Sequence, residues 1–460
     1  MAMGKRRKQK QQSFWVPAEQ VACSPGHPFY RRLNELLEQH GFDGYVEDLC
    51  RRFYHESLGR PGLPPGVYFR MLFVGYFEGI DSERGIDWRC SDSLTLREFL
   101  GYSLTESTPD HSTLCTTRQR IDLETHQDVF VWVLSLLSET GLLAGRQIGV
   151  DATTLEANAA MRSIVRNDSG QGYQQFLEEL AQASGIQTPS REDLAKLDRK
   201  RKKKTSNDDW HNPHDPDAKI TKMKDGRTHL AHKAEHAVDQ DTGAIVSVTL
   251  QPANQGDTTT LWRTLEEAET NLYEVAGGND EIQEDRLLEE VVADKGYHSN
   301  EVLSDLSELE IRSYISEPDR GRRNWKGKQL ERDAVYGNRR RIRGRRGKGL
   351  MRKRGQMLER PFADCYETGG MRRTHLRGSP NILKRLLIHV AGFNLSLLMR
   401  KIFGIGKPRC AQDSAQRLLE GLFAQGRRLA DRFIAAYRLA ERLRRANRLF
   451  RQKSAPATAA

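Results

Sequence analysis

The chain has 460 residues, enough for two or three domains, and its 73 Lys and Arg residues against 62 Asp and Glu residues give a net charge of +11. This composition excludes a small disulfide-stapled scaffold and favours a protein that meets a polyanion. The six cysteines show no paired close spacing, which argues against a zinc site and is typical of a reducing compartment.

The N-terminal part of the chain predicts helices. Residues 1–28 begin MAMGKRRKQKQQ, without the apolar region of a signal peptide, and we expect a flexible basic arm there. Residues 29–143 place apolar side chains three and four positions apart, which predicts an all-α domain. Short helical pairs suit docking to DNA, although a generic helical bundle would show the same pattern. No apolar run looks long enough to cross a membrane, so we expect a soluble, cytoplasmic protein.

The next segment predicts a strand and a long insertion. Residues 146–157, RQIGVDATTLEA, alternate with a period of two, so Asp151 would project from a strand. Residues 158–215 interrupt the pattern and contain one amphipathic helix, residues 173–184. The six consecutive cations at 199–204 cannot pack in a core, and beside a nucleic acid they would contact phosphates.

Residues 228–316 predict a mixed α/β sheet flanked by helices. The pattern is strand, strand, helix, strand, helix, strand, over residues 228–238, 245–250, 258–275, 287–293, 301–309 and 311–316. The strand at 287–293 ends on Asp294, where Gly296 supplies a turn. Because ligands collect at the carboxyl ends of strands in open sheets, Asp294 is a candidate site residue, and a helix cap is the alternative.

The C-terminal part is strongly basic. Ten of the sixteen residues from 339 to 354 are Lys or Arg and none is acidic, so we expect a basic loop over residues 320–354. Glu359 follows it on a short helical pattern. Residues 382–403 predict a helix that packs on the sheet, and residues 404–460 predict an arginine-rich tail with a helix over 418–450.

Four motifs resemble the DDE transposases of bacterial insertion sequences. They are GVDATTLEA at 149–157, KAEHAVDQDTGAI at 233–245, ADKGYHS at 293–299 and LERPFADCYETGGMRRTHLRG at 358–378. The resemblance implies a ribonuclease H-like catalytic domain over residues 144–403, in which Asp151, Asp294 and Glu359 bind two Mg²⁺ or Mn²⁺ ions. Carboxylate oxygens suit these hard cations, and two carboxylates brought together need a cation or a shared proton between them.

The accessory residues depart from the pattern of many relatives, because Gly355 stands four positions before Glu359 and Tyr366 seven after it. Glu367 is the first alternative third acid, Asp364 is another, and Asp215 or Asp217 invite misassignment. His236, Tyr297 and His298 lie near the acids in sequence and either orient water or DNA or simply pack. The cations expected to contact DNA are Arg199, Lys200, Arg201, Lys202, Arg339, Arg340, Arg341, Arg343, Arg345, Arg346, Arg372, Arg373 and Arg377.

The function that follows is transposition by two-metal-ion catalysis. The protein would bind the terminal inverted repeats of its element, cleave DNA there and join the 3′ ends to double-stranded target DNA. We expect a homodimer that holds the two ends of the element together, and a protein associated with the bacterial nucleoid. The alternatives are a structure-specific nuclease or resolvase on the same fold, and a non-catalytic DNA-binding protein derived from a transposase.

Overall fold

The computed structural model describes residues 27–55, 59, 62–201, 205–223, 226–277, 288–319, 321 and 323–409. The chain divides into two units after Gly406, and of the second the structure describes residues 407–409. The expected arm, apart from its last two residues, the expected helix at 418–450 and Lys202 lie outside the described residues.

The first part of the chain is helical, as predicted. Its helices are α1 Pro28–Gln39, α2 Phe42–Cys50, α3 Pro65–Glu78, α4 Glu83–Asp92, α5 Leu94–Phe99, α6 His111–Arg120 and α7 Leu123–Glu139. Side chains cap several of them, since Ser82, Ser93, Asp110 and Asp122 each accept a hydrogen bond from a backbone N–H of the first turn. These caps satisfy N–H groups that have no partner inside the helix.

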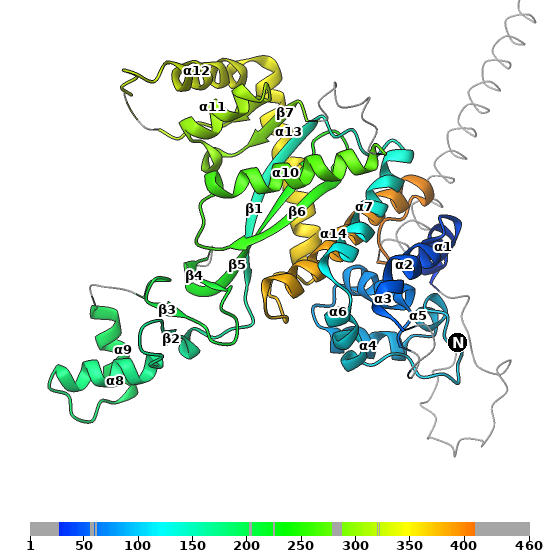
Figure 1. Ribbon diagram of the computed structural model, residues 1–460, viewed down its shortest axis with the longest axis horizontal. Coiled ribbons are helices and arrows are strands. Elements are labelled where there is room, and N and C mark those ends of the chain that lie inside the picture. The colour runs from blue at the N-terminus through cyan, green and yellow to red at the C-terminus, as the bar shows by residue number, and fades with distance from the viewer. Residues whose placement is uncertain are drawn as a thin grey trace, which may run out of the picture. The chain divides into compact units, whose positions relative to one another are not determined.

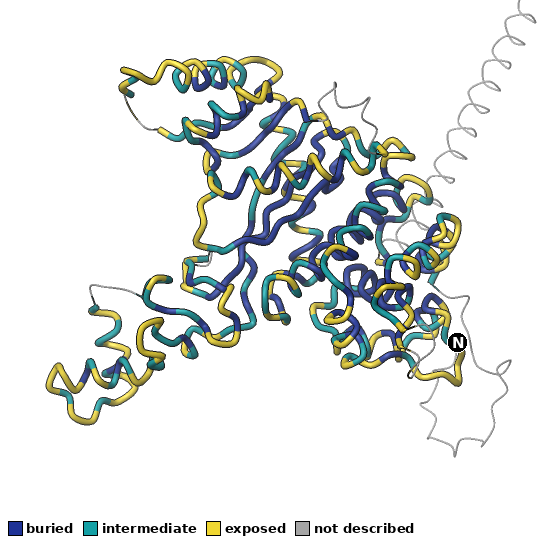
Figure 2. The backbone as a smooth tube through the Cα atoms, in the orientation of Figure 1, coloured by how far each residue is buried: buried dark blue, intermediate teal, exposed yellow. Residues whose placement is uncertain are grey.

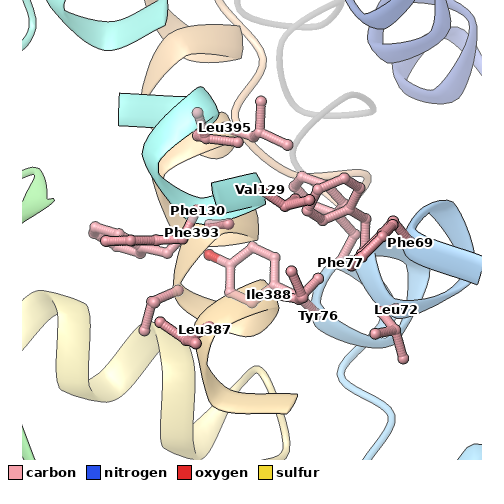
Figure 3. Packing of buried hydrophobic residues seen from close by; sticks show 14 of the residues in the cluster. Phe69, Leu72, Tyr76, Phe77, Val129, Phe130, Leu387, Ile388, Phe393 and Leu395 are labelled. Carbon is pink, nitrogen blue, oxygen red and sulfur yellow. The ribbon is translucent and has the colours of Figure 1, made fainter. Parts of the chain in front are cut away.

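The long helix α14, Ser379–Phe403, shares one hydrophobic core with these N-terminal helices. Figure 3 shows Tyr76 and Phe77 of α3 and Phe130 of α7 packed around Ile388 and Phe393 of α14. Contrary to our expectation from the sequence, α14 is long and apolar enough to cross a membrane, but 94% of its apolar window is buried inside the protein, as in the core helix of a soluble protein. The core is therefore continuous across the expected domain boundary at residue 143.

Two buried cations fasten α14 to its neighbours. Lys384 Nζ donates to the carbonyls of Arg118 and Ile121 at the end of α6, at 3.0 and 2.7 Å. Arg385 donates to the carbonyl of Ile80 at 3.0 Å. A cation at a helix C-terminus satisfies carbonyls that the helix itself leaves open.

The sheet has the mixed topology that the sequence predicts. Its strands are β1 Gln147–Glu156, β4 Lys219–Lys222, β5 Thr228–Asp239, β6 Ile245–Pro252, β7 Glu290–Ala293 and β8 Arg312–Ile315. The order is β4-β5-β1-β7-β8, and β6 also pairs with β5. β5 is antiparallel to β1 and β6, whereas β7 is parallel to β1 and β8. This arrangement is the one that the ribonuclease H-like resemblance implies.

Helices cover both faces of the sheet (Figures 1 and 2). Ile148 and Val150 of β1 share a buried cluster with Leu261 of α10, Asp257–Val275. On the other face lie α13, Arg345–Phe362, and α14. Helix α11, Asn300–Glu308, leads from β7 to β8 and contacts α12, Gln329–Arg343. The sheet is thus buried between two helical layers, and its strand ends are left to carry polar groups.

The expected basic loop at 320–354 is wrong, because α12 and most of α13 occupy residues 329–354. Arginine is a good helix former, and a few apolar residues suffice for packing: Val335 joins the core, and Leu350 contacts Val292 and Tyr314. Carboxylates also neutralise part of the charge, since Arg339 pairs with Glu317 and Arg346 with Glu290.

The insertion also holds more structure than expected. The predicted helix at 173–184 is α8, Tyr173–Ala183, and a second helix, α9, Arg191–Lys200, starts at a capping box formed by Ser190 and Asp193. Two short strands near the two ends of the insertion, β2 Val165–Arg166 and β3 Trp210–His211, pair with each other in an antiparallel arrangement.

Candidate active site

Asp151 lies in the middle strand of the sheet, on the face that α13 covers. Its Oδ1 accepts a hydrogen bond from the N–H of Ala152 at 2.9 Å, and its Oδ2 accepts one from Arg354 of α13 at 3.2 Å. The carboxylate is partly buried, with 31% of the side chain exposed. The Arg354 guanidinium therefore provides a positive charge that stabilises a partly desolvated carboxylate.

Asp294 directly follows β7, the parallel neighbour of β1. The register pairs Val150 with Ala293, so the two acids occupy equivalent positions one residue further along. Asp294 Oδ1 accepts a hydrogen bond from the N–H of Gly296 at 2.7 Å and caps a 3-10 turn, Lys295–Tyr297. It does not cap α11, because Ser299 does so.

The two acids influence each other electrostatically. Burial raises the pKa of Asp151 above its ordinary value, Arg354 and the Ala152 N–H oppose that rise, and the negative charge of Asp294 adds to it. A divalent cation would relieve both the burial and the repulsion, and the oxygen donors are of the kind that Mg²⁺ and Mn²⁺ prefer. On these grounds Asp151 and Asp294 fit a metal site.

Glu359 lies on α13, which packs on β1 and β7, but it is exposed and adjacent to the buried Leu358. Helix α13 approaches β1 closely at Gly149, where an added Cβ would lie 2.8 Å from Leu358 Cδ1. Among the described residues, no three His, Cys, Asp or Glu side chains come close enough to hold a metal ion. The structure thus places Asp151 and Asp294 on neighbouring strands and leaves Glu359 on the exposed side of α13.

The competing acids have other partners. Glu367 pairs with Arg372 at 2.7 Å, and Arg372 also donates to Thr153 of β1. Asp364 lies 3.9 Å from Arg360. Asp215 accepts a hydrogen bond from the N–H of Gly378, and Asp217 accepts one from Ser379, which lowers the pKa of Asp217. These last two acids hold the start of α14.

The aromatic and histidine candidates are buried. His236, opposite Asp151 in β5, shares a hydrogen bond with the Tyr366 hydroxyl at 2.5 Å and stacks on Phe362. Burial lowers the pKa of His236 to about 3. Tyr297 donates to Glu235 at 2.8 Å, and His298 is fully buried. Their surroundings are those of packing residues behind the two acids.

The cations expected to contact DNA fall into two groups. Those that bind protein groups are Arg201 with Asp198, Arg339 with Glu317, Arg341 with Ser313, Arg346 with Glu290, Arg372 with Glu367, Arg373 with Glu156 and Arg377 with the Asn158 carbonyl. Those that are exposed are Lys200, Arg340, Arg343 and Arg345, and Arg199 is exposed as well but also takes part in an interaction within the protein. The second group offers its charge to an outside partner at the smaller cost.

Sequence reasoning missed two features of the site. Arg354 binds Asp151, although the sequence only places it five residues before Glu359. Lys233, Glu235 and Asp257 form a polar group beside the Asp294 turn. The available signal was the alternation of β5, which puts two charged residues on one face of a core strand.

Comparisons with known proteins match most of the chain. Residues 18–120 match a family described as a transposase domain, and residues 183–395 match a family described as a transposase DDE domain. Asp294 and Glu359 fall inside the second match, whereas Asp151 lies between the two. A search of curated proteins found no match.

A solved structure, the Mos1 mariner paired end complex with Mn, aligns with 73% of this chain and 87% of its own at 10% sequence identity. Its TM-score is 0.17, so the fold assignment rests on the sheet topology alone.

Proposed function

Because the chain belongs to the DDE transposases, we propose that it binds the terminal inverted repeats of its own element, cleaves phosphodiester bonds there and joins the 3′ ends to target DNA. The observation that supports this most directly is that Asp151 and Asp294 each come one residue after a paired position, Val150 and Ala293, of two adjacent parallel strands. Carboxylates so placed face one phosphate rather than two separate ones.

Asp151, Asp294 and Glu359 are the residues that would hold two Mg²⁺ or Mn²⁺ ions. Such ions, when bound, favour deprotonation of water or a 3′ hydroxyl and neutralise charge on the leaving oxygen. Glu359 is one helix position away from the sheet-facing Leu358, so a rotation of its side chain is part of the proposal.

The other residues of the site bind and orient. Arg354 neutralises Asp151 when no metal is present, and Arg372 fixes Thr153 two residues further along β1. The exposed Arg340, Arg343 and Arg345 contact DNA phosphates, which positions the duplex without reading its sequence. A homodimer would bring two element ends together, and the N-terminal helices would contribute to end recognition in the bacterial cytoplasm.

The test uses the full-length protein and DNA that carries the ends flanking its coding sequence. With Mg²⁺, the wild-type protein should retard these ends in a gel, cleave them and join them to a plasmid. Asp294→Asn should bind the ends normally but lose cleavage and joining together, because both reactions use the same ligands. Asp333→Asn, an exposed acid of α12 paired with Arg332, is the matched control.

Three outcomes would contradict the proposal. Cleavage without joining would indicate a nuclease or resolvase. End binding without cleavage in the wild-type protein would indicate a DNA-binding protein only. Loss of end binding in Asp294→Asn, with folding intact, would show that Asp294 does not act in catalysis alone.

A further inference from the structure

A group of buried polar side chains lies on the α10 face of the sheet, next to the turn that follows Asp294. Its members come from β5, from α10 and from the turn itself. These residues, the Lys233 network, are Lys233, Glu235, Asp257, Thr260, Thr264 and Tyr297.

Lys233 is the centre of this network. Its ammonium donates to Asp257 Oδ1 at 2.6 Å and to Thr260 Oγ1 at 2.8 Å, and it lies 3.7 Å from Glu235 Oε1. Only 6% of the side chain is exposed. A buried ammonium is costly unless its donors are paired, so these contacts commit Lys233 to the start of α10.

Glu235 extends the network to the Asp294 turn. It is fully buried and accepts hydrogen bonds from Thr260, Thr264 and Tyr297. Tyr297 ends the 3-10 turn that Asp294 caps. Burial raises the pKa of Glu235, and these donors together with Lys233 oppose the rise. The network therefore holds both the start of α10 and the far end of the turn.

Gly296 is the point where the network reaches Asp294. An added Cβ on Gly296 would lie 2.3 Å from Asp257 Oδ2 and 3.0 Å from Asp294 Oδ1. The N–H of the same residue donates to Asp294 Oδ1. Both carboxylates therefore lie close to Gly296. Lys233 binds Oδ1 of Asp257, the oxygen other than the one near Gly296, and its positive charge reduces the repulsion expected between two carboxylates this close to one residue.

We propose that Lys233 and Asp257 are positioning residues that fix the Asp294 carboxylate, through the backbone of Gly296, in the orientation that binds a divalent cation. This rests on the proposed function, in which Asp294 is a metal ligand. Neither residue needs to touch the DNA. Groups that orient a ligand from behind commonly change metal affinity by about 10- to 100-fold when they are replaced.

The first experiment measures Mn²⁺ binding by calorimetry on the full-length protein without DNA. Lys233→Met should weaken Mn²⁺ binding by about tenfold or more, and Lys233→Arg should restore part of it. In the cleavage assay, high Mn²⁺ should recover most of the activity of Lys233→Met. The matched control is Lys219→Met, on the neighbouring strand β4, whose ammonium donates to the Pro216 carbonyl.

The second experiment replaces Gly296 and Asp257, the residues between Lys233 and Asp294, and again measures Mn²⁺ binding. Gly296→Ala, at a position without a positive φ, should weaken Mn²⁺ binding because the new methyl group displaces a carboxylate. Asp257→Asn keeps the shape and removes the charge, and it should weaken binding as well. Losses in the double variant Lys233→Met and Asp257→Asn should be less than additive, since both substitutions break the same ion pair.

Unchanged Mn²⁺ affinity in Asp257→Asn and Gly296→Ala, with thermal unfolding like that of the wild type, would overturn the inference, as would a wild-type protein that binds no Mn²⁺. A wild-type protein that binds Mn²⁺ but neither cleaves nor joins element ends would contradict the proposed function and leave the effect of Lys233 on Mn²⁺ binding to be judged separately.

Discussion

The strand half and the helix half of the candidate site differ in how their residues are held. Asp151 lies on β1 and Asp294 directly follows the parallel strand β7, so the hydrogen-bond ladder, whose last pair is Val150 and Ala293, sets the point from which each acid projects. Glu359 is exposed on α13, and the rotation of this helix is set by side-chain contacts such as those of Leu350 and Leu358 and the ion pair of Arg354 with Asp151. A ladder fixes register to the residue, whereas a sparsely apolar helix leaves the direction of its polar side chains to packing.

The choice of third acid tests the helix half most severely. Glu359→Gln should reduce cleavage by about a thousandfold, the effect of losing several kcal/mol of metal-based stabilisation. Glu367→Gln should reduce it by less than about tenfold, because Glu367 pairs with Arg372. Single-turnover cleavage with Mg²⁺ measures both. A larger loss of cleavage in Glu367→Gln than in Glu359→Gln would indicate that Glu367, not Glu359, is the third metal ligand.

The arginines of α12 and α13 fall into two sets, one expected to contribute to DNA binding and the other to the stability of the fold. Replacing Arg340, Arg343 and Arg345 by Ala should lower the slope of log affinity against log salt by about 0.9 for each phosphate that is no longer neutralised. Replacing Arg339, Arg341 and Arg346 should instead lower stability, since these side chains bind Glu317, Ser313 and Glu290. Fluorescence anisotropy at several salt concentrations, together with urea unfolding, distinguishes the two sets. Equal slopes for both would contradict the division.

The stability of the contact between His236 of β5 and Tyr366, just after α13, should depend on pH. The pKa of buried His236 is about 3, against an ordinary value of 6.5, so the unfolded chain takes up a proton first as the pH falls. Stability should therefore decline between about pH 6.5 and 3, and His236→Phe should reduce that slope by up to about 1.4 kcal/mol per pH unit.

Urea unfolding at several pH values measures the slope. His126 in α7, whose pKa burial also lowers to about 3, provides a comparison among the N-terminal helices. An unchanged slope in His236→Phe would mean that His236 titrates normally in the folded protein.

The effect of Gly→Ala on the free energy of unfolding should differ between β1 and α13. In β1, Gly149→Ala should cost about 1–3 kcal/mol of unfolding free energy, because its Cβ would lie 1.8 Å from Gln240 Nε2 and 2.8 Å from Leu358 Cδ1. In α13, Gly349→Ala meets no atom within 4 Å and should gain about 0.5–1 kcal/mol. Chemical denaturation measures both. A neutral Gly149→Ala would show that α13 shifts easily on the sheet.

Five of the six strands of the main sheet were predictable because each carries a short, self-contained signal, whereas β4, Lys219–Lys222, was not predicted. The predicted strands at 146–157, 228–238, 245–250, 287–293 and 311–316 match β1, β5, β6, β7 and β8 to within a few residues. Helix α12 and the first part of α13 were not predicted from the hydrophobic pattern, because part of their positive charge is neutralised by Glu317 and Glu290, which are distant in the sequence. The end of α13, around Glu359, was predicted as a short helix.

The site divides in the same way. Asp151 and Asp294 could be predicted to lie close together because a carboxylate at the end of an apolar run is visible in one short stretch, and the pairing of Val150 with Ala293 brings the two stretches side by side. The Lys233 network was not found, since Asp257 meets Lys233 only after the hairpin and α10 have folded. The direction of Glu359 depends on how Leu358 packs against Gly149, which no local pattern encodes.

The core that α14 shares with the N-terminal helices limits how this protein can evolve. Exchanging residues 29–143 for the equivalent part of a distant relative would strip Ile388 and Phe393 of their neighbours, Tyr76 and Phe130 among them. Point substitutions on the outer surfaces of these helices should therefore be tolerated better than exchange of the whole segment, and chimaeras cut at residue 143 should be insoluble unless α14 is exchanged with them.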